Sequence, residues 1–284
     1  MSSILNIAGK LDDETVAIFQ EIQTVARELQ ISFVVVGATA RDLVMHYGYG
    51  VPIKRATKDI DFAVYVSSWD EFKLLKERLL EAGYLADRQI QRINTAGGIP
   101  IDIVPFGGVE GDKSNIAWPP EEDFSMSVLG FSEACNSPDN VVIQETPEVV
   151  IPVVSPAGLF LLKLIAWTDR SADVRTKDAE DLGYLLINYE SITVIEDRIY
   201  QNRGLMEAYD YNQRVVGAYL LGSDVGEIAS VDCHAHIKRL VNEDMGSLHL
   251  DVLVEEMCSH PEIDFDRYDK LLSAFLDGFN NTSI

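Results

Sequence analysis

Three aspartates have the residue type and spacing best suited to chemistry in this sequence. Asp59 and Asp61 are separated by one apolar residue, and Asp102 lies between two isoleucines. Side chains alternate between the faces of a strand, so a strand here would place Asp59 and Asp61 on one face. Asp102 joins them if its strand is a neighbour. Such a cluster of oxygen ligands favours Mg²⁺, with Mn²⁺ as an alternative ion.

Two divalent ions about 3.5–4 Å apart can activate a hydroxyl nucleophile and stabilise a pyrophosphate leaving group. The simpler interpretation is that Asp59 and Asp61 belong to an exposed strand face of an acidic protein. The segment upstream favours the metal interpretation. Gly37 follows an apolar run, and the small residues Ala38 and Thr39 open a predicted helix. Glycine lets a phosphate approach the backbone, and the first N–H groups of a helix can bind an anion.

The elements that would position these residues alternate between helix and strand. Apolar residues at helical spacing, capping residues and β-rich runs define them. The pattern predicts helices over 12–29, 39–47 and 68–82, and strands over 31–36, 59–66, 84–93 and 100–106. This alternation implies an α/β core, a mixed sheet flanked by helices.

The pattern changes at Ser155-Pro156, a favourable start for a helix. Helices are predicted over 157–167, over 176–189 and through most of 192–222. We therefore predict two domains, a core over residues 1–150 and a helical C-terminal domain over residues 151–284.

The order of these motifs resembles the signature of polymerase-β-type nucleotidyltransferases, and within that superfamily the AbiEii/AbiGii toxin-type, MenT-like proteins. The resemblance covers roughly residues 30–190. The matching segments are Val36–Leu43, Thr57–Phe62, Leu162–Arg170 and Lys177–Leu182.

The resemblance implies roles for individual residues. Asp59 and Asp61 would bind both metal ions, and Asp102 would complete the catalytic metal site and help to deprotonate the acceptor hydroxyl. The implied phosphate, nucleotide and acceptor contacts are Gly37, Ala38, Thr39, Lys163, Lys177, Asp178 and Asp181. Ala38 departs from the family pattern, which has serine or glycine at this position.

Several of these residues have a simpler interpretation. Arg41 is a candidate phosphate contact, or it pairs with Asp42 or another acid. Lys163 either reaches into a cleft or is a snorkelling lysine of an apolar helix. The cleft interpretation predicts that Lys163→Ala loses activity with little change in melting temperature. Lys177 and Asp178 could form an ordinary helix N-terminus.

Two other motifs are assigned no chemistry. The segment 107–114 is interpreted as a turn, because Asp112 stands where a phosphate-binding loop would require glycine. Cys233, His234 and His236, with later Cys and His residues (His249, Cys258, His260), do not have the spacing of a closed zinc site.

Composition limits the class of protein. The chain has 284 residues, 47% of them hydrophobic, and a net charge of −23 from 23 basic and 46 acidic residues. That charge opposes unassisted binding to nucleic acid or anionic lipid, but not to a metal-complexed nucleotide. The sequence shows no secretory signal or membrane span, and its odd number of cysteines fits a reducing compartment. We expect a cytoplasmic location.

The expected reaction is transfer of an NMP unit from an NTP to an acceptor hydroxyl, with release of pyrophosphate. The family resemblance implies an RNA end, such as a tRNA acceptor stem, as acceptor, and an antitoxin as partner. A protein side chain and a cationic small molecule, as in antibiotic-modifying enzymes, are alternative acceptors. A nucleotide-binding regulatory protein without turnover is the alternative from another class.

Overall fold

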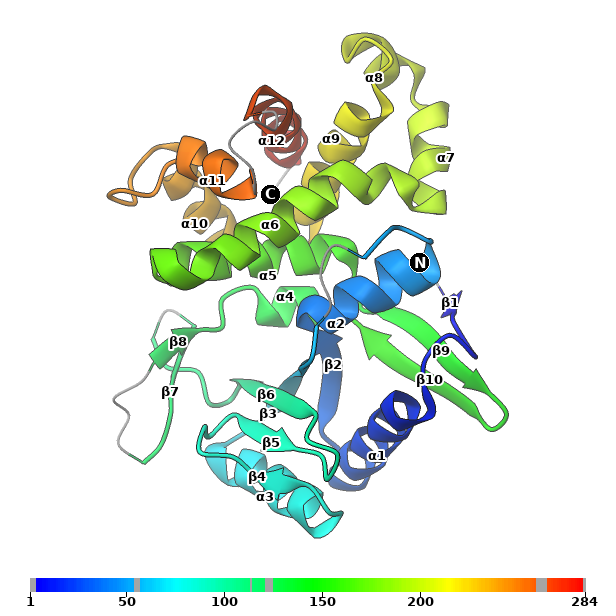
Figure 1. Ribbon diagram of the computed structural model, residues 1–284. Coiled ribbons are helices and arrows are strands. Elements are labelled where there is room, and N and C mark those ends of the chain that lie inside the picture. Colours follow the sequence, from blue (N-terminus) through cyan, green and yellow to red (C-terminus); the bar gives the residue numbers. More distant parts are fainter. Residues whose placement is uncertain (1–3, 54–56, 113, 121–124, 259–264, 283–284) are drawn as a thin grey trace. The chain divides into compact units, whose positions relative to one another are not determined.

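The computed structural model describes residues 4–53, 57–112, 114–120, 125–258 and 265–282. The chain divides into two compact units, Met1–Ser155 and Pro156–Ile284 (Figure 1). The first unit is built on a β-sheet and the second is helical. No helix among the described residues combines the length and the apolar character needed to cross a membrane.

The first unit is organised around a mixed sheet of eight strands within the described residues. In spatial order the strands are β1 (Ile4–Asn6), β9 (Asp139–Glu145), β10 (Glu148–Val153), β2 (Ser32–Val36), β3 (Ile60–Val66), β6 (Pro100–Gly107), β5 (Arg92–Asn94) and β4 (Leu85–Ala86). The pairs β1–β9, β10–β2 and β3–β6 are parallel, and the other neighbours are antiparallel. The predicted α/β class with a mixed sheet is therefore confirmed.

The remaining elements of the first unit are α1 (Asp13–Leu29), α2 (Gly37–Arg41), the π-helix η1 (Asp42–Gly48), α3 (Trp69–Glu81), the separate strands β7 (Asn115–Ala117) and β8 (Ser125–Ser127), and α4 (Phe131–Cys135). Helices α1 and α3 begin at side-chain caps. Asp12 accepts the N–H of Thr15 at 2.8 Å, and Ser68 accepts the N–H of Glu71 at 3.3 Å. These bonds satisfy first-turn N–H groups and fix where each helix starts.

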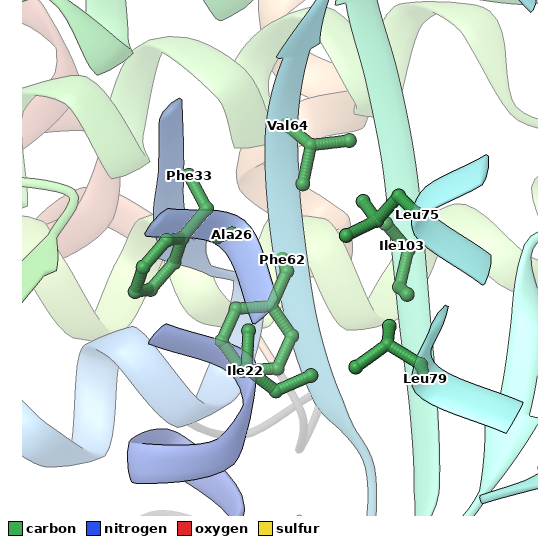
Figure 2. Close-up of a pocket in the computed structure, with 8 residues that line it drawn as sticks. All are labelled: Ile22, Ala26, Phe33, Phe62, Val64, Leu75, Leu79 and Ile103. Carbon is green, nitrogen blue, oxygen red and sulfur yellow. The ribbon is translucent and has the colours of Figure 1, made fainter. Parts of the chain in front are cut away.

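One face of the sheet packs on α1 and α3 and forms the core (Figure 2). The side chains that meet there come from α1, β2, β3, α3 and β6, and all are apolar: Ile22, Ala26, Phe33, Phe62, Val64, Leu75, Leu79 and Ile103. Burying the larger of these side chains contributes roughly 1.5–3 kcal/mol each. Because residues alternate along β3 and β6, the side chains between these core residues point to the opposite face.

Two segments differ from the predicted elements. Residues 84–93 were predicted as one edge strand, but they contain the short strand β4, a connection and the start of β5. The predicted helix over 39–47 begins earlier, at Gly37, and widens into a π-helix from Asp42. π-Helical turns carry no simple residue pattern, so apolar spacing does not reveal them.

The second unit consists of α5 (Pro156–Asp169), α6 (Ala172–Asn188), the 3₁₀-helix η2 (Tyr189–Ser191), α7 (Thr193–Gln201), α8 (Arg203–Ala208), α9 (Gln213–Ile228), α10 (Val231–Val241), α11 (Leu250–Met257) and α12 (Phe265–Asn280). Glycines let α9 and α12 pack closely. A Cβ at Gly222 would lie 1.9 Å from the carbonyl oxygen of Phe275, and a Cβ at Gly278 would lie 1.9 Å from that of Tyr219. The rings of Phe160 and Phe275 are 4.4 Å apart and link α5 to this pair.

Candidate active site

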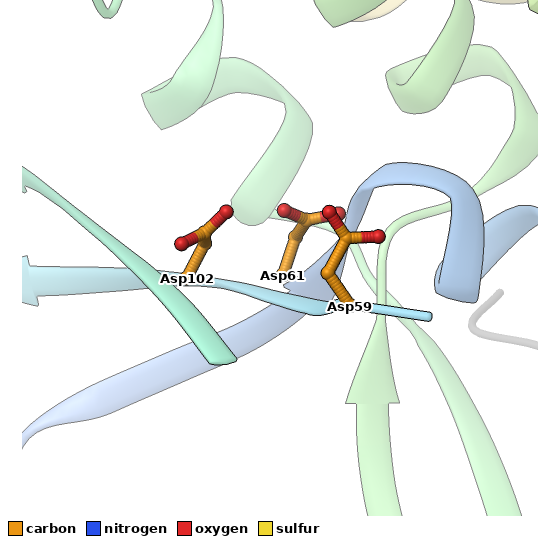
Figure 3. Close-up of side chains that lie close together, drawn as sticks. All are labelled: Asp59, Asp61 and Asp102. Carbon is orange, nitrogen blue, oxygen red and sulfur yellow. The ribbon is translucent and has the colours of Figure 1, made fainter. Parts of the chain in front are cut away.

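The three aspartates meet on the sheet face opposite α1 and α3. Figure 3 shows the side chains of Asp59, Asp61 and Asp102 rising from the same side of their strands. One carboxylate oxygen from each lies within 4.8 Å of the others, and all three residues are partly buried. Among the described residues, this is the group of His, Cys, Asp and Glu side chains close enough to share a metal ion.

Strand register brings the two strand aspartates together. Asp61 of β3 and Asp102 of β6 are direct partners in the parallel pair, so their side chains project side by side. Asp59 immediately precedes β3 and lies on the same face, because it is two residues before Asp61. Apolar neighbours such as Ile60 and Ile101, both buried, anchor the strands to the core.

Two threonines hold Asp59 in place. The Thr57 hydroxyl donates to Asp59 Oδ1 at 2.8 Å, and the Thr39 hydroxyl donates to the Asp59 carbonyl oxygen at 2.9 Å. The hydroxyl hydrogen of Thr39 is therefore committed to the backbone next to the cluster. A phosphate contact by Thr39 would therefore use its backbone N–H. A contact by Ala38, which has no hydroxyl, would also use the backbone N–H.

Gly37 is required by the position of Asp61. Its φ of +70° lies in the left-handed region, and a Cβ there would lie 2.0 Å from Asp61 Oδ2. Side chains are strained at positive φ, and this one would also displace a carboxylate of the cluster. Glycine thus lets the β2–α2 turn lie against the cluster. The predicted approach of a phosphate to the backbone at this turn requires the same absence of a side chain.

We expect Gly37→Ala to lower the free energy of unfolding by about 1–3 kcal/mol and NTP turnover by about tenfold to a hundredfold, because strain and a moved Asp61 act together. Gly9→Ala is the matched control. Its φ is +76° and nothing lies within 4 Å of its Cβ position, so it carries the backbone strain without the contact. Chemical denaturation and initial rates measure both effects. Equal turnover in the two variants would show that the contact with Asp61 does not matter.

Arg92 is a residue of this site that the sequence reasoning missed. It lies on β5 directly opposite Asp102. Its Nε donates to Asp102 Oδ1 at 2.7 Å and its Nη2 donates to Oδ2 at 2.6 Å. The same Nη2 lies 3.9 Å from Asp59 Oδ2. The hydrogen bonds that Arg92 donates to Asp102, with the charges of Asp102 and Asp59, raise the pKa of Arg92 despite partial burial.

A signal for this pair does exist in the sequence. Arg92 and Asp102 are equally distant from Gly97, and the turn at Gly97-Gly98 closes a hairpin in which β5 pairs with β6. A hairpin centred there places them opposite each other. The apolar residues of 84–93 are too few and irregular to reveal the register by themselves.

The cluster is chemically suited to a divalent cation. Three carboxylates supply hard oxygen donors, which fit Mg²⁺ or Mn²⁺ better than a soft metal. Arg92 supplies one positive charge beside the three negative ones. A divalent ion bound there would add positive charge next to all three carboxylates.

Arg41 pairs with Asp42 in the structure. Its Nη2 lies 2.7 Å from Asp42 Oδ1, and its side chain is 0% exposed. Of the two interpretations of the sequence, the structure thus brings Arg41 to Asp42, and the pair is buried rather than on the surface.

Lys163 of α5 lies between two acids of α6. Its Nζ is 2.9 Å from Asp178 Oδ1 and 2.9 Å from Asp181 Oδ2, and Arg170 Nη1 lies 2.7 Å from Asp178 Oδ2. The side chains of Asp178 and Asp181 are 1% and 0% exposed, and both lie against this lysine. Removing a partner of such a pair is destabilising. The expectation that Lys163→Ala leaves the melting temperature nearly unchanged must therefore be revised. Lys177, also of α6, is exposed.

The cysteines and histidines of the second unit have separate environments. Cys233 is buried, His234 Nε2 lies 3.0 Å from the carbonyl oxygen of Gly226, and His236 Nε2 lies 2.8 Å from the Thr168 hydroxyl. His260 lies outside the described residues, as does Lys113 of the segment 107–114.

Solved structures offer distant likenesses. The antibiotic-resistance factor ANT(2'')-Ia is 15% identical, with a TM-score of 0.37, over 71% of this chain and 99% of that one. The Thermotoga maritima CCA-adding enzyme, solved with tRNA, is 13% identical, with a TM-score of 0.27, over 96% of this chain and 82% of that one. Among curated proteins, none matches the sequence.

A family match covers most of the chain. The family described as nucleotidyl transferase AbiEii toxin, of type IV toxin–antitoxin systems, matches residues 22–245. This range includes the aspartate cluster, Gly37, Arg92 and Lys163. The protein is therefore a member of the AbiEii nucleotidyltransferase family.

Proposed function

We propose that this nucleotidyltransferase moves an NMP unit from an NTP to the hydroxyl of an acceptor, with two Mg²⁺ ions held by the aspartate cluster. The observation that carries the proposal is the convergence of three carboxylate oxygens within 4.8 Å of one another. Asp59 and Asp61 would hold both ions, and Asp102 would complete the site of the ion nearer the acceptor. When bound, the ions supply neutralisation of phosphate charge and activation of the hydroxyl.

The proposed reaction forms one bond and breaks another, and residues of the chain hold the phosphates and accept the proton. The acceptor oxygen forms a bond to the α-phosphorus, and the bond from the α-phosphorus to the oxygen bridging to the β-phosphorus breaks. Pyrophosphate carries that electron pair away. The hydroxyl proton passes to the Asp102 carboxylate. The turn at Gly37, with the N–H groups of Ala38 and Thr39, is proposed to receive the β- and γ-phosphates. In this scheme catalysis consists of positioning and electrostatic stabilisation.

An RNA end is the acceptor that we propose, with an antitoxin as the partner that restrains the enzyme in the cytoplasm. The family's assignment to toxin–antitoxin systems supports both. The net charge of −23 disfavours RNA binding by the chain as a whole. We therefore propose that RNA contacts are confined to the neighbourhood of the metal ions. Protein and cationic small-molecule acceptors are the alternatives to be tested.

Labelled nucleotides test this proposal. Purified protein is incubated with each NTP, labelled at the α- or the γ-phosphate, and with total RNA, cell protein or aminocyclitols. We expect label in the RNA fraction from α-labelled NTP only, because the γ-phosphate leaves in pyrophosphate. EDTA and Asp61→Asn should abolish it. Binding of Mg-NTP without labelled product in any fraction would instead support a regulatory protein without turnover.

A further inference from the structure

Arg92 is hydrogen-bonded to Asp102, the third carboxylate of the cluster, and a metal ion that binds Asp102 must alter these bonds. Both oxygens of Asp102 accept a hydrogen bond from its guanidinium, at 2.7 and 2.6 Å. This is the planar, two-point geometry that arginine makes with carboxylates. A divalent ion on Asp102 would take an oxygen that Arg92 holds, or share it with a second positive charge nearby.

The guanidinium is also part of the cluster rather than a remote support. Its Nη2 lies 3.9 Å from Asp59 Oδ2, and its side chain is 26% exposed, so it borders both the carboxylates and open space. Arg92 therefore has room to change partner. Phosphate oxygens attract a guanidinium as carboxylates do, with the same two-point geometry.

We infer that Arg92 is an exchangeable counter-ion, which holds Asp102 in the metal-free protein and transfers to a phosphate of the metal–nucleotide complex. This inference rests on the proposed function, because it assumes a metal-bound nucleotide at the cluster. Arg92 then opposes binding of the metal alone and favours binding of metal and nucleotide together. Binding of the metal ion to Asp102 is then coupled to binding of the nucleotide phosphate.

This coupling predicts that one substitution raises the affinity for the metal alone and lowers the affinity for the nucleotide. Arg92→Gln removes the competing charge, so Mn²⁺ alone should bind about tenfold more tightly to the metal-free protein. The same variant loses a phosphate contact, so a non-hydrolysable NTP at saturating Mn²⁺ should bind about tenfold more weakly. A residue that only supports the fold would weaken both. Calorimetry on the full chain measures the two affinities.

Two further variants control the experiment. Arg88→Gln removes the same charge from an exposed residue between β4 and β5, and both affinities should equal those of the wild type. Arg92→Lys keeps the charge but not the two-point geometry, and it should fall between wild type and Arg92→Gln. It also preserves the test if Arg92→Gln does not fold.

The results distinguish a failure of the Arg92 exchange from a failure of the proposed metal-dependent function. Mn²⁺ affinity in the Arg92 variants that equals or falls below that of the wild type would overturn the exchange, while metal binding by the wild type would leave the proposed function standing. If neither the wild type nor Arg92→Gln binds Mn²⁺, with or without a non-hydrolysable NTP, the metal site itself is wrong and the exchange falls with it.

Discussion

Replacing Asp61 with asparagine is expected to reduce NMP transfer by about 10³-fold, the effect of losing several kcal/mol of metal-based stabilisation. The substitution keeps the shape of the side chain beside Gly37 and removes its charge. Because Asp61 is the direct strand partner of Asp102, the loss falls at the centre of the cluster. Initial rates with saturating NTP and Mg²⁺ measure the effect.

Stability should respond differently from activity. Asparagine at position 61 keeps the size of the side chain, so the metal-free variant should remain folded at the temperature of the assay. Asp269→Asn, at an exposed position of α12, makes the same charge change and should leave transfer unchanged. Transfer by Asp61→Asn within tenfold of wild type would exclude Asp61 as a metal ligand.

Replacing Lys163 with methionine is expected to lower the free energy of unfolding by about 3–5 kcal/mol. Asp178 would keep Arg170 but lose the lysine, and Asp181 would lose the same lysine; removing a cationic partner from a buried carboxylate is costly. Chemical denaturation measures the change. The double variant Lys163→Met/Asp181→Asn should recover part of the loss, because an amide is cheaper to bury than a carboxylate.

The pH dependence of this pair follows from the pKa of Lys163. Burial lowers this pKa, but the charges of Asp181 and Asp178 outweigh burial and raise it above 10.5. The folded state therefore holds the proton more tightly than the unfolded state. The stabilisation by Lys163 should be constant below pH 10.5 and decline as the pH rises through the folded pKa.

The exposed Lys177 supplies the control for Lys163. It lies on α6 and loses the same charge in Lys177→Met, which should change stability by no more than about 0.5 kcal/mol. A similar small change in Lys163→Met would show that the buried ion pairs contribute little.

The sequence was most informative where a single strand or helix determines the arrangement. Alternation along a strand put Asp59 and Asp61 on one face, and capping residues marked the starts of α1 and α3. The meeting of Asp102 with them depended on which strands are neighbours. That is decided by long-range packing, so the sequence could state it only as a condition.

Pairs between elements were harder to anticipate. The contacts of Arg92 depend on the register of two short strands, and those of Lys163 depend on how α5 lies against α6. Thr39 shows the same limit. Its residue type does not reveal that the fold directs its hydroxyl to the carbonyl oxygen of Asp59.

The in-register pairing of β3 with β6 limits how the chain length can vary. One residue inserted between Pro100 and Ile101 would shift the later residues of β6 by one position relative to β3, and Ile101 would replace the third carboxylate on the cluster face. The aspartate would then point into the apolar layer against α1 and α3. Extra residues placed after Gly107 leave that alternation intact. Length changes compatible with activity, whether natural or engineered, should therefore be found beyond the end of β6 and not within β6 ahead of Asp102.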